Sequence, residues 1–325
     1  MKMNFLYCFF LALPFLFSCE RSGQETPEKP EEGGSIPVAA TEPFTVSVSS
    51  FNLLGVYSKL AWEPRQEAVK AIITRTDHDP DVIGFQECST NPIKSSMPTL
   101  LANAYTFHVS ADSNCDPALI AWKKDKYTLV EGGITDMLQT NLEYTAATKK
   151  SNLAHWVRLK EKAGGREFLL YNIHVKTNSS SVSYQKLRYD CIQGLLEAAA
   201  FRSKHAGDIP VLIVGDFNNY LQTVEEGCIS APAACLAGGY ADAASAAATR
   251  KNFQYKTYVT DVDEGVVSTW SSKDSRLDYI FVWSSKGAAV ESYQTVIDFI
   301  PGSTTRINTP VPSDHCPVNA VIKFN

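Results

Sequence analysis

The sequence predicts an α/β fold in which two mixed, partly antiparallel β-sheets pack face to face with helices on the outside. Short runs rich in β-branched or aromatic residues and bounded by turn residues, as at 168–173 and 211–214, are typical of buried strands. Amphipathic helical patterns separate some of these runs. Others follow one another with no helix between them, as within 153–175, so neighbouring strands must be partly antiparallel. Two packed sheets with helices outside bury these apolar faces most economically.

The chain begins with a predicted export signal. Lys2 precedes an apolar run over residues 5–17, which is too short for a permanent membrane helix and suits the core of a signal peptide. The run ends in Leu16-Phe17-Ser18-Cys19, which resembles the lipobox of bacterial lipoproteins, whose cysteine becomes the acylated first residue. We therefore expect residues 1–18 to be a lipoprotein signal peptide and Cys19 to carry a lipid anchor. The protein would then lie in the cell envelope, on the periplasmic face of a membrane or at the cell surface. An ordinary secretory signal with an incidental cysteine is the alternative.

Residues 19–43 are predicted to form an acidic, flexible tether. From residue 20 onward this stretch holds six Glu, four Pro and three Gly, and it has too little apolar surface to offset the cost of ordering. The formal charge of the chain is −5, of which Lys2 contributes +1 and residues 20–43 contribute −4, leaving −2 for residues 44–325. A non-specific nucleic-acid binder usually has a strong basic surplus, so composition alone does not favour one.

Residues 44–325 are predicted to be a single catalytic domain, because no repeat, low-complexity stretch or internal linker divides them. Strands are expected at 45–52, 81–87, 106–110, 118–123, 127–134, 153–160, 167–175, 210–216, 278–283 and 317–323. Helices are expected at 64–76 and 184–203.

The cysteines of this domain predict one disulfide and no thiolate metal site. Cys228 and Cys235 flank a short Ala/Pro-rich loop in a chain expected to be exported, so a bridge between them is a candidate. Cys88 and Cys316 match no zinc spacing, and we expect them to be small buried packing residues.

Carboxylate, amide and imidazole side chains lie at the ends of the apolar runs. They are Asn52, Glu87, His174, Asp216 with Asn218, Asp278, and Asp314 with His315. A polar group at the mouth of a buried strand is costly unless it is paired or binds a metal. Each residue alone has a structural explanation, such as a strand-end cap or a surface histidine. Together they indicate one hard-cation site with imidazoles beside it.

Five motifs occur in an order that resembles the endonuclease/exonuclease/phosphatase superfamily, the deoxyribonuclease I-like fold. They are Ser-Phe-Asn at 50–52, Gln-Glu at 86–87, Asn-Ile-His at 172–174, Gly-Asp-Phe-Asn at 215–218 and Ser-Asp-His at 313–315, and Arg-Leu-Asp-Tyr-Ile at 276–280 is similar to a further motif of the family. The resemblance covers nearly all of residues 44–325. It implies a four-layered α/β sandwich with the active site where strand ends of both sheets meet.

The residue types and the resemblance together imply a Mg²⁺ or Mn²⁺ site. Glu87 resembles the principal carboxylate ligand, with Asn52 nearby and Asp314 completing the oxygen shell. Mg²⁺ keeps several waters and takes few protein oxygens, so a sparse shell suffices.

The same reasoning assigns catalytic roles. Asp216 is expected to orient or deprotonate the attacking water. Asn218 is expected to hold that water in place or to bind the phosphate. His174 and His315 are expected on either side of the scissile phosphate. Asp278 is expected to orient His315, and Asp116 is a candidate for the same task at His174, although an Asp-Pro turn also explains it.

The substrate is expected to be a phosphodiester, with nucleic acid the leading candidate. The segment 174–177 resembles the His-x-Lys-Ser/Thr of secreted nuclease-like members, so Lys176 is a candidate phosphate-binding residue. A phosphatase or a sphingomyelinase-like phospholipid or small-molecule phosphoesterase is the alternative, and we expect a monomer. A non-catalytic binding module on the same fold would be expected to have lost Glu87, Asp216 or His315, and all are present.

Overall fold

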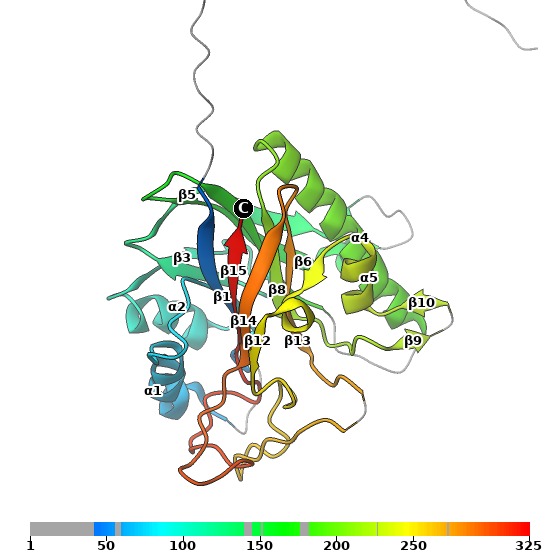
Figure 1. The fold of residues 1–325 in the computed structure, drawn as a ribbon. Helices are drawn as coiled ribbons and strands as arrows, with labels where there is room; N and C mark the ends of the chain where they lie inside the picture. Colours follow the sequence, from blue (N-terminus) through cyan, green and yellow to red (C-terminus); the bar gives the residue numbers. More distant parts are fainter. Residues whose placement is uncertain are drawn as a thin grey trace, which may run out of the picture. The chain divides into compact units, whose positions relative to one another are not determined.

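Two β-sheets form the framework of the described part of the chain, which comprises residues 42–55, 60–139, 145–150, 152–175, 182–225, 227–271 and 273–325 of this computed structural model (Figure 1). The strands are β1 (Phe44–Asn52), β2 (Val82–Gln86), β3 (Tyr105–Val109), β4 (Leu119–Lys123), β5 (Tyr127–Asp136), β6 (Leu153–Glu161), β7 (Glu167–His174), β8 (Val211–Asp216), β9 (Val224–Glu225), β10 (Cys228–Ile229), β11 (Ala241–Asp242), β12 (Thr249–Lys251), β13 (Asp278–Trp283), β14 (Ala288–Thr295) and β15 (Val318–Phe324). The helices are α1 (Trp62–Ile73), α2 (Asn91–Leu100), α3 (Ala146–Lys150), α4 (Val182–His205), α5 (Ala231–Ala237) and α6 (Ala243–Ala246).

Both sheets are mixed and largely antiparallel. The first has seven strands in the order β12-β14-β15-β1-β2-β4-β3, and the second has six in the order β11-β13-β8-β7-β6-β5. Strand pairs β1–β2, β12–β14 and β7–β8 are parallel, and the remaining pairs in these two sheets are antiparallel. The predicted pair of mixed, largely antiparallel sheets is therefore confirmed.

Three apolar clusters divide the domain into four layers. Val48 of β1, Leu170 of β7 and Leu212 of β8 belong to a buried cluster between the two sheets. A second cluster joins the outer face of the six-stranded sheet to α4 and α5, and a third joins the seven-stranded sheet to α1 and α2. Helices thus cover opposite outer faces of the sandwich, as predicted (Figure 1).

The helices differ from their predicted bounds by a few residues, and some elements were not predicted. The helix expected at 64–76 is α1, and the helix expected at 184–203 is α4. Strand β14 was missed because its alternation is interrupted by an irregular register between Val290 and Ser292. Helix α2 was missed because it contains Pro98, a residue that usually ends a helix.

The predicted Cys228–Cys235 disulfide is wrong, because both cysteines are free thiols. Cys235 lies on α5 and is buried in the apolar cluster against the six-stranded sheet, whereas Cys228 lies on the short strand β10. Cys88 and Cys316 are buried, as expected of packing residues, and burial raises the pKa of the Cys316 thiol to about 12.

The predicted signal peptide, Cys19 and all but the last two residues of the predicted tether lie outside the described residues. No helix in the described part of the chain is both long and apolar enough to cross a membrane.

Candidate active site

The register of the strands brings polar residues from both sheets to one edge. In the seven-stranded sheet, Asn52 at the end of β1 is opposite Gln86 at the end of the parallel strand β2. In the six-stranded sheet, His174 at the end of β7 is opposite Asp216 at the end of β8, and Asp278 at the start of β13 is opposite the same aspartate. Parallel strands end at the same edge and an antiparallel neighbour begins there, so topology alone gathers these side chains.

Glu87 and Asn52 are in direct contact. The Asn52 amide nitrogen donates to Glu87 Oε1 at 3.1 Å and to Asp216 Oδ2 at 3.0 Å, while its Oδ1 accepts from the backbone of Leu54. The other oxygen of Glu87 accepts from the backbone nitrogen of Gly55 at 3.2 Å. A Cβ at Gly55 would lie 1.9 Å from the carbonyl oxygen of Glu87, so only glycine fits this approach. Asn52 therefore links the carboxylates of the two sheets.

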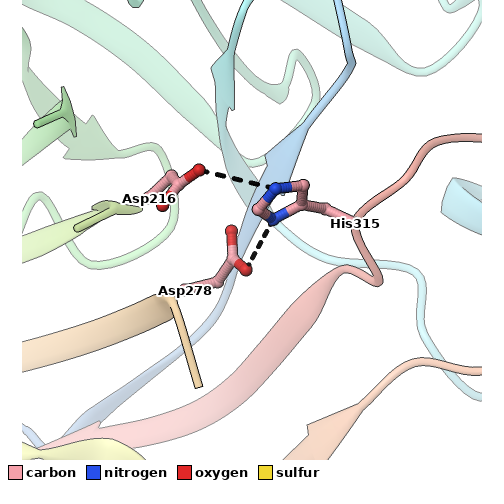
Figure 2. Close-up of side chains that lie close together, drawn as sticks. All are labelled: Asp216, Asp278 and His315. Carbon is pink, nitrogen blue, oxygen red and sulfur yellow. Dashed lines mark hydrogen bonds and ion pairs between the residues drawn. The ribbon is translucent and has the colours of Figure 1, made fainter. Parts of the chain in front are cut away.

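The His315 imidazole lies between two buried carboxylates (Figure 2). Its Nδ1 is 2.9 Å from Asp278 Oδ2 and its Nε2 is 3.6 Å from Asp216 Oδ2. Burial alone lowers the pKa of His315, but Asp278 and Asp216 outweigh it and raise the pKa well above the ordinary value. Burial raises the pKa of the Asp278 carboxyl. The two neighbouring carboxylates therefore favour the protonated, charged imidazole of His315.

His174 is the second imidazole near Asp216 Oδ2. Its Nε2 is 3.9 Å from Asp216 Oδ2 and its Nδ1 is 3.0 Å from Asp116 Oδ2. Burial lowers the pKa of His174, but Asp116, then Asp216 and Glu87, outweigh it and raise the pKa to about 9. This favours protonation, yet the amide nitrogen of Asn218 lies 3.0 Å from Nε2, a contact that requires Nε2 to carry no proton.

The Asn218 contact decides the protonation of His174 in this geometry. The same amide nitrogen also donates to the backbone oxygen of Val175 at 2.8 Å, which fixes its orientation. His174 therefore fits as the neutral form with its proton on Nδ1, directed at Asp116. Protonating Nε2 requires Asn218 to turn away from the imidazole.

The structure brings some of the predicted metal and catalytic residues together and leaves others apart. Ligand atoms of Asp216, Asp278 and His315 lie within 4.8 Å of one another, close enough to share an ion. The Asp314 carboxylate contacts the hydroxyl of Ser313 at 3.3 Å, and within the described residues no hydrogen bond or ion pair joins it to Glu87 or Asn52. Lys176, the predicted phosphate-binding residue, lies outside the described residues.

Two buried amides that received no role from the sequence join the sheets below the site. Asn172 of β7 donates to the backbone oxygens of Phe85 and Leu119, at 2.8 and 3.0 Å, across the sandwich. Its own oxygen accepts from Gln86 at 2.6 Å. Both amides lie inside motifs noted above. A polar residue within an apolar run was the feature of the sequence that could have identified them as structural hydrogen-bonding residues. They tie β2 to β7, one residue before Glu87 and two residues before His174.

Arg65 and Thr257 were also missed as site residues. The fully buried Arg65 guanidinium donates to the backbone oxygens of Leu54 and Pro312, at 2.6 and 2.8 Å, and so joins the loop after Asn52 to the loop before Asp314. Burial lowers the pKa of Arg65 to about 10. The Thr257 hydroxyl accepts from the backbone nitrogen of Asp278 at 3.2 Å and fixes the start of β13.

Comparison with known proteins places these features in a family. The family model described as "Endonuclease/Exonuclease/phosphatase family" matches residues 49–315. Carbon catabolite repressor protein 4 homolog 3 of Arabidopsis thaliana is 27% identical over 205 residues, which cover 58% of this chain and 43% of that protein. The chain thus spans less than half the length of this curated relative.

Solved structures show the same fold. An endonuclease/exonuclease/phosphatase family protein from Bacteroides thetaiotaomicron superimposes with a TM-score of 0.69 at 21% identity, covering 88% of this chain and 97% of that one. A mannosyl-6-phosphatase from the same species gives a TM-score of 0.66 at 22% identity, covering 86% of this chain and all of that one, 100%.

Proposed function

Because the chain belongs to the endonuclease/exonuclease/phosphatase family, whose members are hydrolases of phosphoester bonds, we propose that it is a divalent-metal-dependent phosphodiesterase. The observation that carries this proposal is the position of Asp216, whose Oδ2 lies 3.6 Å from Nε2 of His315 and 3.9 Å from Nε2 of His174. A carboxylate between two imidazoles, each held by its own aspartate, suits proton transfer and stabilisation of charge on a phosphoryl group.

The residues present fit a hard cation best at Glu87. The side chain of Glu87 is 20% exposed, and each of its oxygens accepts one hydrogen bond, so lone pairs remain for an ion. The Asp216, Asp278 and His315 set fits less well, because a ligating imidazole must be deprotonated and His315 faces a carboxylate through each ring nitrogen. Bound Mg²⁺ or Mn²⁺ would polarise the phosphoryl group and stabilise negative charge on it.

The protein's own side chains supply the remaining chemistry. Asp216 would orient the attacking water and accept its proton, and Asn52 and the backbone nitrogen of Asn218 would hold the carboxylate in place. Charged His315 would face the phosphoryl oxygens or protonate the leaving oxygen from Nε2, with Asp278 holding Nδ1. His174 would face the phosphate from the other side, with Asn218 beside it. Asp314 stays a predicted metal ligand.

Nucleic acid is our leading substrate, and a small phosphoester is the second. The near-neutral domain limits counterion release to a local groove, so we expect modest affinity, a need for low salt and a shallow salt dependence if the substrate is DNA or RNA. The second candidate is a sugar phosphate, since a mannosyl-6-phosphatase has a similar fold and the domain has no basic surplus. A phospholipid is a further small-substrate alternative.

The test is an activity panel on the purified protein in Mg²⁺ and Mn²⁺. It includes plasmid DNA, RNA, sphingomyelin, inositol phosphates, mannose 6-phosphate and bis-p-nitrophenyl phosphate, at low and moderate salt. Nicking or degradation of nucleic acid at low salt supports the leading candidate. Clear cleavage of a phospholipid or a sugar phosphate, with DNA and RNA intact, overturns the nuclease assignment. Inactivity on every phosphoester contradicts the proposal as a whole.

We also propose that Cys19 anchors the protein by lipid to a membrane of the cell envelope, with residues 19–43 as the tether. The signal-like residues 1–18 and the acidic, Pro-rich composition that follows support this location.

A further inference from the structure

Tyr258 lies beside His315 on the same face of a short antiparallel pairing. The two residues form an isolated bridge, flanked by backbone hydrogen bonds from Val259 to Asp314 at 2.7 Å and from Cys316 to Thr257 at 2.8 Å. This pattern defines the non-hydrogen-bonded type of pair, in which the two Cα atoms are about 4.5 Å apart and the side chains are closest. The Tyr258 and His315 side chains therefore leave this pairing on the same face, and the His315 imidazole faces Asp216.

Tyr220 and Lys256 both lie next to Tyr258. The hydroxyls of Tyr220 and Tyr258 are 3.3 Å apart, and Lys256 Nζ lies 5.2 Å from the centroid of the Tyr258 ring. Tyr220 is 38% exposed, and it follows Asp216 by four residues. Burial, with the Tyr258 hydroxyl beside it, raises the pKa of Tyr220 to about 12, so the phenol stays neutral at physiological pH. No carboxylate of the described residues forms an ion pair with Lys256.

We propose that Tyr220, Tyr258 and Lys256 bind the nucleoside part of a substrate, with the base against the tyrosine rings and a neighbouring phosphate at Lys256. This assignment rests on the proposed function, since the scissile phosphate is taken to lie between His315 and His174. The two phenol hydroxyls lie within hydrogen-bond distance of each other, which ties up one of their two donors and leaves the half-exposed Tyr220 ring as the larger surface for a ligand. Flat bases stack on such rings whatever their sequence, and the Lys256 ammonium, which pairs with no carboxylate of the described residues, suits the next phosphate. A hydroxyl-rich sugar would call for more unpaired hydrogen-bonding groups.

Calorimetric binding of thymidine 5′-monophosphate and of 2-deoxyribose 5-phosphate to the full chain in Mg²⁺ tests the base contact. Because stacking of one base on an aromatic ring changes binding by roughly 5- to 150-fold, the wild-type protein should prefer the base-bearing ligand by about that factor. Tyr220→Leu should abolish the preference, and Tyr220→Phe, which keeps the ring, should retain it. Phe201→Leu, at an exposed ring on α4, is the matched control and should change nothing.

Equal binding of the two ligands by the wild-type protein, or an unchanged preference in Tyr220→Leu, overturns the inference. Lys256→Gln should remove any tighter binding of thymidine 3′,5′-bisphosphate over the 5′-monophosphate, and a retained advantage removes Lys256 from the site. Hydrolysis of bis-p-nitrophenyl phosphate by the same samples separates the two claims. Hydrolysis without base preference contradicts this inference alone, whereas base preference without any phosphoester hydrolysis supports it and contradicts the proposed function.

Discussion

Replacing Asp278 with asparagine should lower the pKa of His315 by about one to three units, because it removes one opposite charge in contact with the ring. Asp278 Oδ2 is 2.9 Å from Nδ1, and the second carboxylate, on Asp216, is farther away at 3.6 Å from Nε2. The substitution therefore removes the closer of two charges while keeping the side-chain shape. A shift of this size corresponds to about 1.4 to 4 kcal/mol of lost preference for the imidazolium.

The assay is a pH titration of the imidazole nitrogens by ¹⁵N NMR in metal-free protein, alongside turnover as a function of pH. If charged His315 is needed, activity is lost as pH rises through its pKa, so the falling limb should move to lower pH in Asp278→Asn. Turnover at neutral pH should fall on the order of 10- to 100-fold, as for other residues that act through a histidine. Asp79→Asn, at an exposed ion pair with Lys123, is the matched control. An unchanged pKa of His315 in Asp278→Asn refutes the reasoning.

Three further predictions follow from other residues. Asp216→Asn should lower kcat on the order of 10²–10⁴-fold at saturating Mg²⁺, as for a lost general base, and near wild-type turnover in steady-state assays would remove it from this role. Burial lowers the pKa of His155 to about 3, so its contribution to stability is present above the unfolded pKa near 6.5 and is lost as pH falls toward the folded value. Between pH 7 and 5 that loss is roughly 2 kcal/mol, so urea unfolding of His155→Gln should depend less on pH by this amount, and parallel curves would contradict the assignment. Cys19→Ser should release the protein from the membrane fraction, and unchanged fractionation would mean another anchor or none.

The strand ends that carry the site could be predicted because each is a polar residue next to an apolar run, after it at Asn52, His174 and Asp216 and before it at Asp278. Asp216 is the first charged residue after the apolar run 211–214, and β8 ends at this residue. Which strands lie side by side was not available from such local patterns. The contact between His174 and Asp116 joins residues 58 positions apart, and the structure confirms Asp116 as the candidate partner, although its Asp-Pro pair equally suited a turn.

Interactions that depend on loop geometry were the hardest to predict. Tyr258 lies in a segment without long strands, and only its isolated pairing with His315 brings it to the site. In the sequence, Arg65 looks like the other charged residues of an amphipathic helix. In the structure it is buried, because backbone oxygens of two loops, at Leu54 and Pro312, accept its hydrogen bonds. The Cys228–Cys235 prediction failed for the same reason, since closeness in sequence did not account for Cys235 facing the core from α5.

The Mg²⁺ dependence of bis-p-nitrophenyl phosphate hydrolysis tests the central claim most directly. Chelated protein should be inactive and should recover with Mg²⁺ or Mn²⁺. Glu87→Gln should need on the order of 10- to 100-fold more Mg²⁺ for half-maximal activity, whereas Glu67→Gln, at an exposed position of α1, should match the wild-type protein. Activity that survives chelation, or a Glu87→Gln variant with the wild-type Mg²⁺ requirement, would contradict a metal-dependent phosphoesterase with its cation at Glu87.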